Sequence, residues 1–241
     1  HRTGDGTAYI YKTTDLGNTW TKLATEQIEG YALSVREDLV NPNLLFLGTE
    51  FGLYISIDGG VNWAHFDNNM PKVGVRDMVI QQRENALVMG THGRGIIIID
   101  DISPLRKVDE ELLSQDLVFF EGEPTMLKDP GAGGGWFGGA GNFIGGNPNT
   151  NAQITYYMKK RHTFGKMYIE VFDANGKLVK KLPAGKSAGI NSVDMPTSLP
   201  KPKAAPTDNR MALFGSMSGP NLSMGIYKVV LTKGKKTYET S

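Results

Sequence analysis

A short pattern occurs twice in the first part of the 241-residue chain, and it constrains the fold more than any other feature. Residues 13–20 (TTDLGNTW) match residues 56–63 (SIDGGVNW), and the two aspartates are 43 residues apart. A second marker keeps nearly the same step, because Gly48-Thr49 recurs as Gly90-Thr91. A repeat of about 40–45 residues is the length of one four-stranded β-propeller blade. The spacing therefore predicts an all-β chain that begins with propeller blades.

Each copy of the pattern contains one aspartate, one glycine and one tryptophan, namely Asp15, Gly17, Trp20, Asp58, Gly60 and Trp63. A short aspartate side chain accepts hydrogen bonds from nearby backbone N–H groups and folds the chain into a turn. Glycine adopts the positive φ that such a turn needs, and tryptophan can bury a large ring against the hairpin. We interpret these six residues as structural rather than catalytic.

The overall charge argues against several classes of partner. The 26 lysines and arginines nearly balance the 25 acidic residues, so no bulk field attracts nucleic acid or an anionic membrane. No apolar run is long enough to span a bilayer, so membrane insertion is not expected. The chain has no cysteine, which removes disulfides and thiolate chemistry but leaves export possible.

Residues 1–108 are predicted to form the last blades of the propeller. Short apolar runs at 31–35, 44–48, 53–56, 75–80, 86–90 and 96–99 alternate with turns. The run 96–99 is apolar throughout, as expected of a strand buried on both faces. Two repeats and a partial third cannot close a ring of four to eight blades. We therefore expect a piece of a longer polypeptide, whose remaining N-terminal blades are the first partner of this chain.

Two further regions are predicted after the propeller. Residues 109–151 contain the end of a short helix over 105–114, a strand at 117–120 and a glycine-rich linker, to which Trp136, Phe137 and Phe143 add aromatic rings. Residues 152–241 carry about six short strands with hairpin turns. The Asn175-Gly176 pair between two of them is a strong hairpin signal. This pattern predicts a small immunoglobulin-like or fibronectin-like β-sandwich.

These motifs resemble the Asp-box, or BNR, repeats of large bacterial propeller proteins of the sortilin-like and glycosyl-hydrolase-like type. The resemblance continues through residues 90–105, then through the strand 154–157, the hairpin 175–179 and the strand 225–229. It implies an exported protein of the periplasm, the cell surface or the medium. It also implies that the repeated turns lie on the outer rim, away from any ligand face. Hydrolase activity does not follow from the fold alone.

Three residues are candidates for a ligand site: His92, Arg94 and Arg76. His92 and Arg94 occupy a glycine-rich turn between strands, where propeller loops bind ligands. The alternative is that Arg94 pairs with an acidic residue of the segment 100–101, and that Arg76 forms a surface ion pair with Asp77. The four histidines are scattered, so neither a metal site nor a cofactor is expected. The run 159–161 (KKR) beside two tyrosines is more typical of a solvated strand end than of a nucleic-acid platform.

The sequence thus favours a non-catalytic binding or scaffolding module with a protein or glycan ligand. One alternative is a sialidase-like or endoglucanase-like glycoside hydrolase, whose catalytic residues would lie in the missing blades. Another is an assembly factor that docks on a membrane complex.

Overall fold

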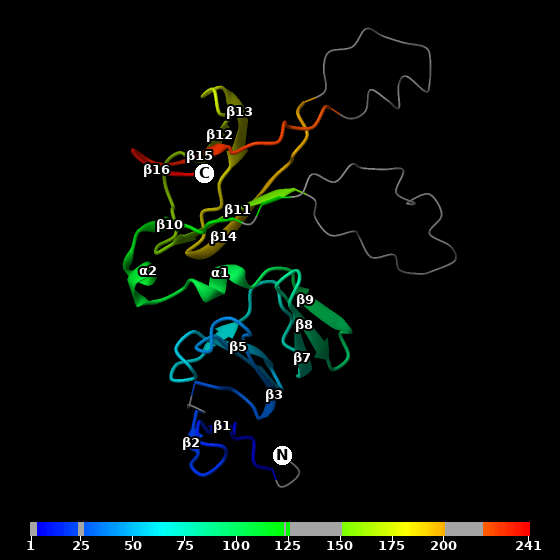
Figure 1. Cartoon of the computed structure of the whole chain (residues 1–241). Coiled ribbons are helices and arrows are strands. Elements are labelled where there is room, and N and C mark those ends of the chain that lie inside the picture. The colour runs from blue at the N-terminus through cyan, green and yellow to red at the C-terminus, as the bar shows by residue number, and fades with distance from the viewer. Residues whose placement is uncertain (1–3, 24–26, 123, 126–150, 201–218) are drawn as a thin grey trace, which may run out of the picture. The chain divides into compact units, whose positions relative to one another are not determined.

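The computed structural model describes residues 4–23, 27–122, 124–125, 151–200 and 219–241, and strands dominate it (Figure 1). The chain divides into two compact units, His1–Leu113 and Ser114–Ser241. The sheets in the described residues are antiparallel, and none of them is closed. The all-β class predicted from the sequence is therefore confirmed. Most of the predicted glycine-rich linker, with its three aromatic residues, lies outside the described residues.

The first unit contains three sheets in chain order. The first sheet has two strands, β1 (Tyr11–Lys12) and β2 (Thr21–Lys22). The second sheet has four, β3 (Ala32–Glu37), β4 (Leu45–Thr49), β5 (Gly52–Ser56) and β6 (Ala64–Phe66). The third sheet has three, β7 (Val75–Gln81), β8 (Ala86–Thr91) and β9 (Ile96–Ile99). Within each sheet, strands that follow one another in the chain pair with each other.

The second and third sheets repeat each other in detail. Both carry a bulge in their first strand, between Ala32 and Ser34 and again between Val75 and Asp77, which is the 43-residue step of the sequence. A bulge bends the strand and strengthens its twist. The repeat is therefore structural as well as sequential.

Two apolar cores hold these sheets together. Between the first and second sheets lie Ala8, Ile10, Ile28, Leu45, Leu47, Tyr54 and Trp63. Between the second and third lie Leu44, Phe46, Leu53, Ile55, Val75, Met78, Ile80, Leu87, Met89 and Ile102. Successive side chains of a strand point to opposite faces. This alternation is why neighbouring residues of β4, such as Phe46 and Leu47, belong to different cores.

The predicted helix over 105–114 is instead two short helices, α1 (Ser103–Arg106) and α2 (Glu110–Ser114). The carboxylate of Asp109 accepts a hydrogen bond from the backbone N–H of Leu112 (2.8 Å), which is the geometry of a helix N-cap. Asp109 thus starts a new helix where the sequence suggested continuation. Ile102, just before α1, is completely buried in the core of the last two sheets.

The second unit consists of two sheets that share one core. One sheet has the order β10 (Leu117–Phe119), β11 (Ala152–Met158), β14 (Gly189–Met195). The other has the order β13 (Leu178–Pro183), β12 (Met167–Phe172), β15 (Lys228–Lys233), β16 (Lys236–Thr240). Their buried side chains form one cluster that includes Ile154, Tyr156, Met158, Ile169, Val171 and Leu231. The predicted hairpin at Asn175-Gly176 is found between β12 and β13.

Two strand predictions are wrong. The run 96–99 forms β9, but Ile96 and Ile98 are 70% and 52% exposed. This strand is the edge of its sheet, and no described element covers their face. The strand predicted from Gly225 begins only at Lys228, and Ile226 before it is exposed.

Candidate functional site

The two repeated turns share three hydrogen bonds between equivalent atoms. The Ser56 hydroxyl donates to Oδ1 of Asp58 (2.7 Å) and accepts the backbone N–H of Gly60 (2.9 Å), while the backbone N–H of Asn62 donates to Asp58 Oδ1 (2.9 Å). The same three bonds, at 2.8, 2.9 and 2.9 Å, join Thr13, Asp15, Gly17 and Thr19. The glycine of each turn has a φ of +93°, a conformation that strains any residue with a Cβ.

Both carboxylates are kept ionised by their turns. Hydrogen bonds from the hydroxyl and the backbone N–H of Thr19 lower the pKa of Asp15 to about 2. Burial would raise the pKa of Asp58, but hydrogen bonds from Asn62 and Ser56 outweigh burial and lower it. A carboxylate held in this way is a poor proton donor near neutral pH. The geometry thus gives both aspartates a local structural role.

The two tryptophans differ. Trp63 is 5% exposed, and its Nε1 donates to the carbonyl of Leu23, which follows the first sheet (3.2 Å). Trp20 is 60% exposed, and its Nε1 donates to the carbonyl of Gly17 in its own turn (3.1 Å). The prediction that the ring of Trp20 is buried is therefore wrong. The first sheet has no described sheet before it that could supply the counterpart of Leu23.

The three candidate ligand residues lie at one end of the third sheet. The turn from β8 to β9 is closed by Thr91, whose hydroxyl and backbone N–H both donate to the carbonyl of Gly95 (2.7 and 3.0 Å). Within this turn His92 and Arg94 are exposed. Arg76 is exposed at the bulge of β7, where Val75 pairs with Thr91. This end of the sheet therefore offers two guanidinium groups and one imidazole to solvent.

Neither of the alternative ion pairs for these arginines forms. Asp77 pairs with Arg36 of β3 (3.0 Å) and not with Arg76. Among the described residues, no carboxylate lies within ion-pair distance of Arg94, so the pairing with segment 100–101 is wrong as well. Their hydrogen-bond donors are thus available to a ligand.

Sequence reasoning gave no role to Arg106 of α1, which makes a buried polar cluster. Its Nε and Nη2 donate to the two carboxylate oxygens of Asp38, each at 2.9 Å, and its Nη1 donates to Oδ1 of Asn85 (2.6 Å). The Asp38 side chain is fully buried. These residues are far apart in the chain and belong to common types, so no local pattern signals the cluster.

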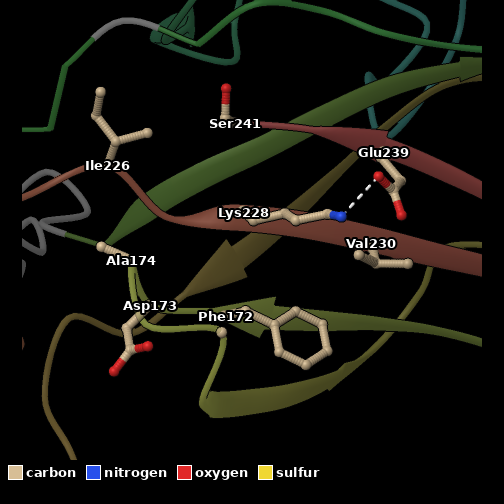
Figure 2. A pocket seen from close by; sticks show the side chains of 9 residues that line it. Phe172, Asp173, Ala174, Ile226, Lys228, Val230, Glu239 and Ser241 are labelled. Atoms are coloured by element: carbon tan, nitrogen blue, oxygen red, sulfur yellow. Dashed lines mark ion pairs between the residues drawn. The ribbon is translucent and has the colours of Figure 1, made fainter.

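The second unit has an open hollow of about 660 Å³ on the outer face of the sheet formed by β12, β13, β15 and β16. Figure 2 shows Phe172 and Val230 on its floor, and it shows Lys228 reaching toward Glu239. The two residues form an ion pair at 2.7 Å, so their charges compensate each other. The carboxylate of Asp173, which also lines the hollow, accepts hydrogen bonds from the backbone N–H groups of Asn175 and Lys177, each at 2.9 Å. The charged side chains of the lining are therefore already engaged within the protein.

Within the described part of the chain, no group of three or more histidine, aspartate and glutamate side chains is arranged to hold a metal ion. None of the helices described there has the length and apolar character needed to cross a bilayer. Comparison of the chain with protein-family models, with curated proteins and with solved structures gives no match.

Proposed function

We propose that the first unit is the C-terminal part of an Asp-box β-propeller that acts as a non-catalytic binding or scaffolding module in a large exported bacterial protein. The three hydrogen bonds that the two turns share and the repeated bulge support the repeat architecture. Two antiparallel sheets over one core suit an immunoglobulin-like or fibronectin-like second unit.

The face of the third sheet that points away from the second sheet is evidence for a further sheet. In the second sheet, three apolar residues that are at most 8% exposed face the third sheet: Phe46, Leu53 and Ile55. Their counterparts 42 or 43 residues later are Val88, Ile96 and Ile98. Two of these later residues are exposed, so an apolar face equivalent to a buried one has no described partner. A further blade would bury it.

The first sheet has an uncovered face on its other side, the side that in the second sheet packs on the preceding sheet. Tyr11 and Trp20 are exposed, whereas their counterparts 43 residues later, Tyr54 and Trp63, are buried against the preceding sheet. The uncovered face of the third sheet and the uncovered face of the first sheet are thus equivalent to the two faces that pack together between successive sheets. Further sheets of the same repeat between them would complete a closed ring, in which each sheet packs face to face on its neighbours and only short, protected edges remain. We infer that the remaining blades are the first partner of this chain.

One observation carries the non-catalytic assignment: four carboxylates of the first unit are already engaged. Glycoside hydrolysis needs a pair of carboxyl groups that face the scissile bond. Asp77 is held by Arg36 and Asp38 by Arg106, while the turn aspartates bind their own backbone. The exposed His92, Arg94 and Arg76 supply donors and positive charge. Such a surface suits recognition of a glycan or protein rich in acidic or hydroxyl groups.

The assignment is tested by measuring turnover and binding on the same protein. The purified chain is assayed with sialoside and β-glucan substrates and, in parallel, on an array of glycans and acidic peptides. We expect binding without product, weakened by Arg94→Ala. Arg83→Ala is the matched control, because Arg83 lies in the turn at the other end of the sheet and pairs with Glu84.

Equal effects of the two substitutions, or no binding at all, would contradict the proposed ligand surface. Product formation by a polypeptide that carries further blades would favour the glycoside hydrolase. Co-purification of such a polypeptide with a membrane complex would favour the assembly factor.

The ring itself is tested through the uncovered face of the third sheet. We expect the 241-residue chain to self-associate with rising concentration in analytical ultracentrifugation, because its two uncovered faces are complementary. Ile98→Glu should abolish the association, whereas Val61→Glu, an exposed position in the second Asp-box turn, should not. A chain that stays monomeric at all accessible concentrations would argue against docking of sheets on this face.

A further inference from the structure

One end of the second unit gathers eight cationic side chains. We call this surface the basic end, and it comprises Lys159, Lys160, Arg161, Lys166, Lys186, Lys233, Lys235 and Lys236. The chain as a whole has a net charge of only +1, so its composition conceals this concentration of charge.

Strand register brings these residues together. The loop 159–166 joins β11 to β12, the loop 184–188 joins β13 to β14, and a tight turn joins β15 to β16. The pairs Met158–Gly189 and Met167–Lys233 place all three connections at the same end of the two sheets. Backbone hydrogen bonds tie the loops to one another. The N–H of His162 donates to the carbonyl of Lys186, and that of Gly234 to the carbonyl of Lys166, each at 2.9 Å.

The positive charge of the basic end is largely uncompensated. Asp116, the acidic residue before β10, binds Lys233 (2.7 Å) and Lys236 (3.6 Å). Five other cations are exposed and have no carboxylate within ion-pair distance among the described residues: Lys160, Arg161, Lys166, Lys186 and Lys235. Among the other acidic residues described in this unit, Glu170 and Glu239 already pair with Lys181 and Lys228, and Asp173 and Asp194 lie toward the other end.

An aromatic residue stands in the middle of these cations. Phe164, in the loop 159–166, is 88% exposed, although phenylalanine is normally buried. It precedes Gly165, whose φ of +97° allows the loop to turn there. The basic end therefore combines several separated positive charges with one exposed apolar side chain that packs in no described core.

We propose that the basic end is a docking surface for a bilayer that contains anionic lipids. Juxtaposed lysines and arginines are attracted to anionic headgroups, and an aromatic ring anchors at the boundary between headgroups and acyl chains. Single-stranded nucleic acid is the weaker fit, because its binders stack successive bases on several aromatic rings in a groove. Here one ring is exposed, the cations lie on three separate loops, and the hollow of this unit lies at the opposite end.

The test uses the whole chain and vesicles of phosphatidylcholine, with or without about one third phosphatidylglycerol. We expect co-sedimentation with the anionic vesicles only, and weaker binding as salt is added, because salt screens exposed charge. Lys160→Glu should weaken partitioning about tenfold or more, since each charge near an anionic surface changes binding about fivefold. Phe164→Ala should also weaken it several-fold. Lys177→Glu is the matched control, because Lys177 is exposed in the hairpin at the other end of the unit.

Three results would overturn the proposal. The first is no binding to anionic vesicles at low salt. The second is equal partitioning of wild type and Phe164→Ala, or equal losses for Lys160→Glu and Lys177→Glu. The third is tight binding of a single-stranded oligonucleotide that is lost in Lys160→Glu while vesicles fail to compete, which would identify a nucleic-acid surface instead.

Discussion

Arg106 donates two hydrogen bonds to the buried carboxylate of Asp38, and it thereby connects the second and third sheets of the first unit. Asp38 lies in the turn between β3 and β4, and Arg106 also binds Asn85 in the turn between β7 and β8. Its own backbone carbonyl accepts a bond from Asn41 (3.1 Å). The short helix α1 thus connects equivalent turns of two repeats. These turns lie at the end of the sheets opposite to the turn that carries His92 and Arg94.

Replacing Arg106 should therefore destabilise the first unit strongly. Arg106→Met leaves the Asp38 carboxylate buried with only the backbone N–H groups of Val40 and Asn41 as donors. Removal of one partner from such a buried pair costs about 3–5 kcal/mol. The measurement is urea unfolding at neutral pH. A loss below about 0.5 kcal/mol, the size typical of an unpaired surface change, would contradict the structural role.

The same pair predicts the sign of a pH effect. Burial would raise the pKa of Asp38, but hydrogen bonds from Arg106 and from the backbone N–H groups of Asn41 and Val40 outweigh burial and lower it. The stability that the pair contributes is present above the unfolded-state pKa of about 4 and is lost as the pH falls through the lower folded-state pKa. The gap in stability between wild type and Arg106→Met should therefore be largest near neutral pH and shrink below about pH 4. A gap that widens in acid would contradict this sign.

The two Asp-box turns should respond unequally to the same substitution. Asp58→Ala removes a partly buried acceptor of several hydrogen bonds beside the packed Trp63, and it should cost about 1–2 kcal/mol. Asp15→Ala should cost clearly less, because its turn is exposed and Trp20 packs on no described sheet. Thermal unfolding of the two variants side by side measures the difference. Equal losses would show that packing around the turn is irrelevant.

The difference between these turns marks what the sequence could predict. The pattern of aspartate, glycine and tryptophan is local, so it predicts the turn and its hydrogen bonds from residues at most seven positions apart. The exposure of Trp20, by contrast, depends on whether another sheet lies against it. The prediction that β9 is buried on both faces is wrong for the same reason. The spacing of apolar residues shows which residues are apolar, but it does not show what covers them.

The candidate site shows the same division. The glycine-rich turn that carries His92 and Arg94 was recognisable, because its glycines and its position between two apolar runs are sequence features. The pairing of Asp77 with Arg36, 41 residues away, was not recognisable, since it depends on the packing of two sheets. The basic end escaped notice for a related reason. Its cations come from three connections that are separated along the chain and meet only through strand register.

In the second unit, Asp116 should stabilise the packing of the two sheets, because it precedes β10 and binds residues of β15 and β16. Hydrogen bonds from Lys233 and Tyr238, both at 2.7 Å, lower the pKa of Asp116 to about 2. Because the carboxylate is partly exposed, Asp116→Asn should cost only about 1 kcal/mol or less at neutral pH. The wild type should lose this increment between about pH 4 and pH 2, whereas the variant should not. Unfolding midpoints across this range, with Asp194→Asn as a control on the same unit, measure the effect. Parallel pH profiles of wild type and Asp116→Asn would contradict this role.

The sharpest prediction compares two glycines at equivalent positions of the repeat, Gly48 and Gly90. A Cβ on Gly48 would lie 2.5 Å from the carbonyl oxygen of Val75, in the backbone of the next sheet, which cannot move aside. A Cβ on Gly90 would meet nothing closer than 3.9 Å. Gly48→Ala should therefore cost about 2–3 kcal/mol by overpacking. Gly90→Ala should be neutral or stabilising by up to about 1 kcal/mol, because alanine restricts the unfolded chain.

Gly90 also lies on the face that a further blade would cover. If another sheet packs on the third sheet as the third packs on the second, its backbone will approach Gly90 as Val75 approaches Gly48. Gly90→Ala should then leave the unfolding free energy of dilute monomer unchanged or raised, and yet weaken the concentration-dependent association seen in ultracentrifugation. Full association of Gly90→Ala would show that the third sheet does not receive a neighbour in the manner of the second, and the closed ring would have to be abandoned.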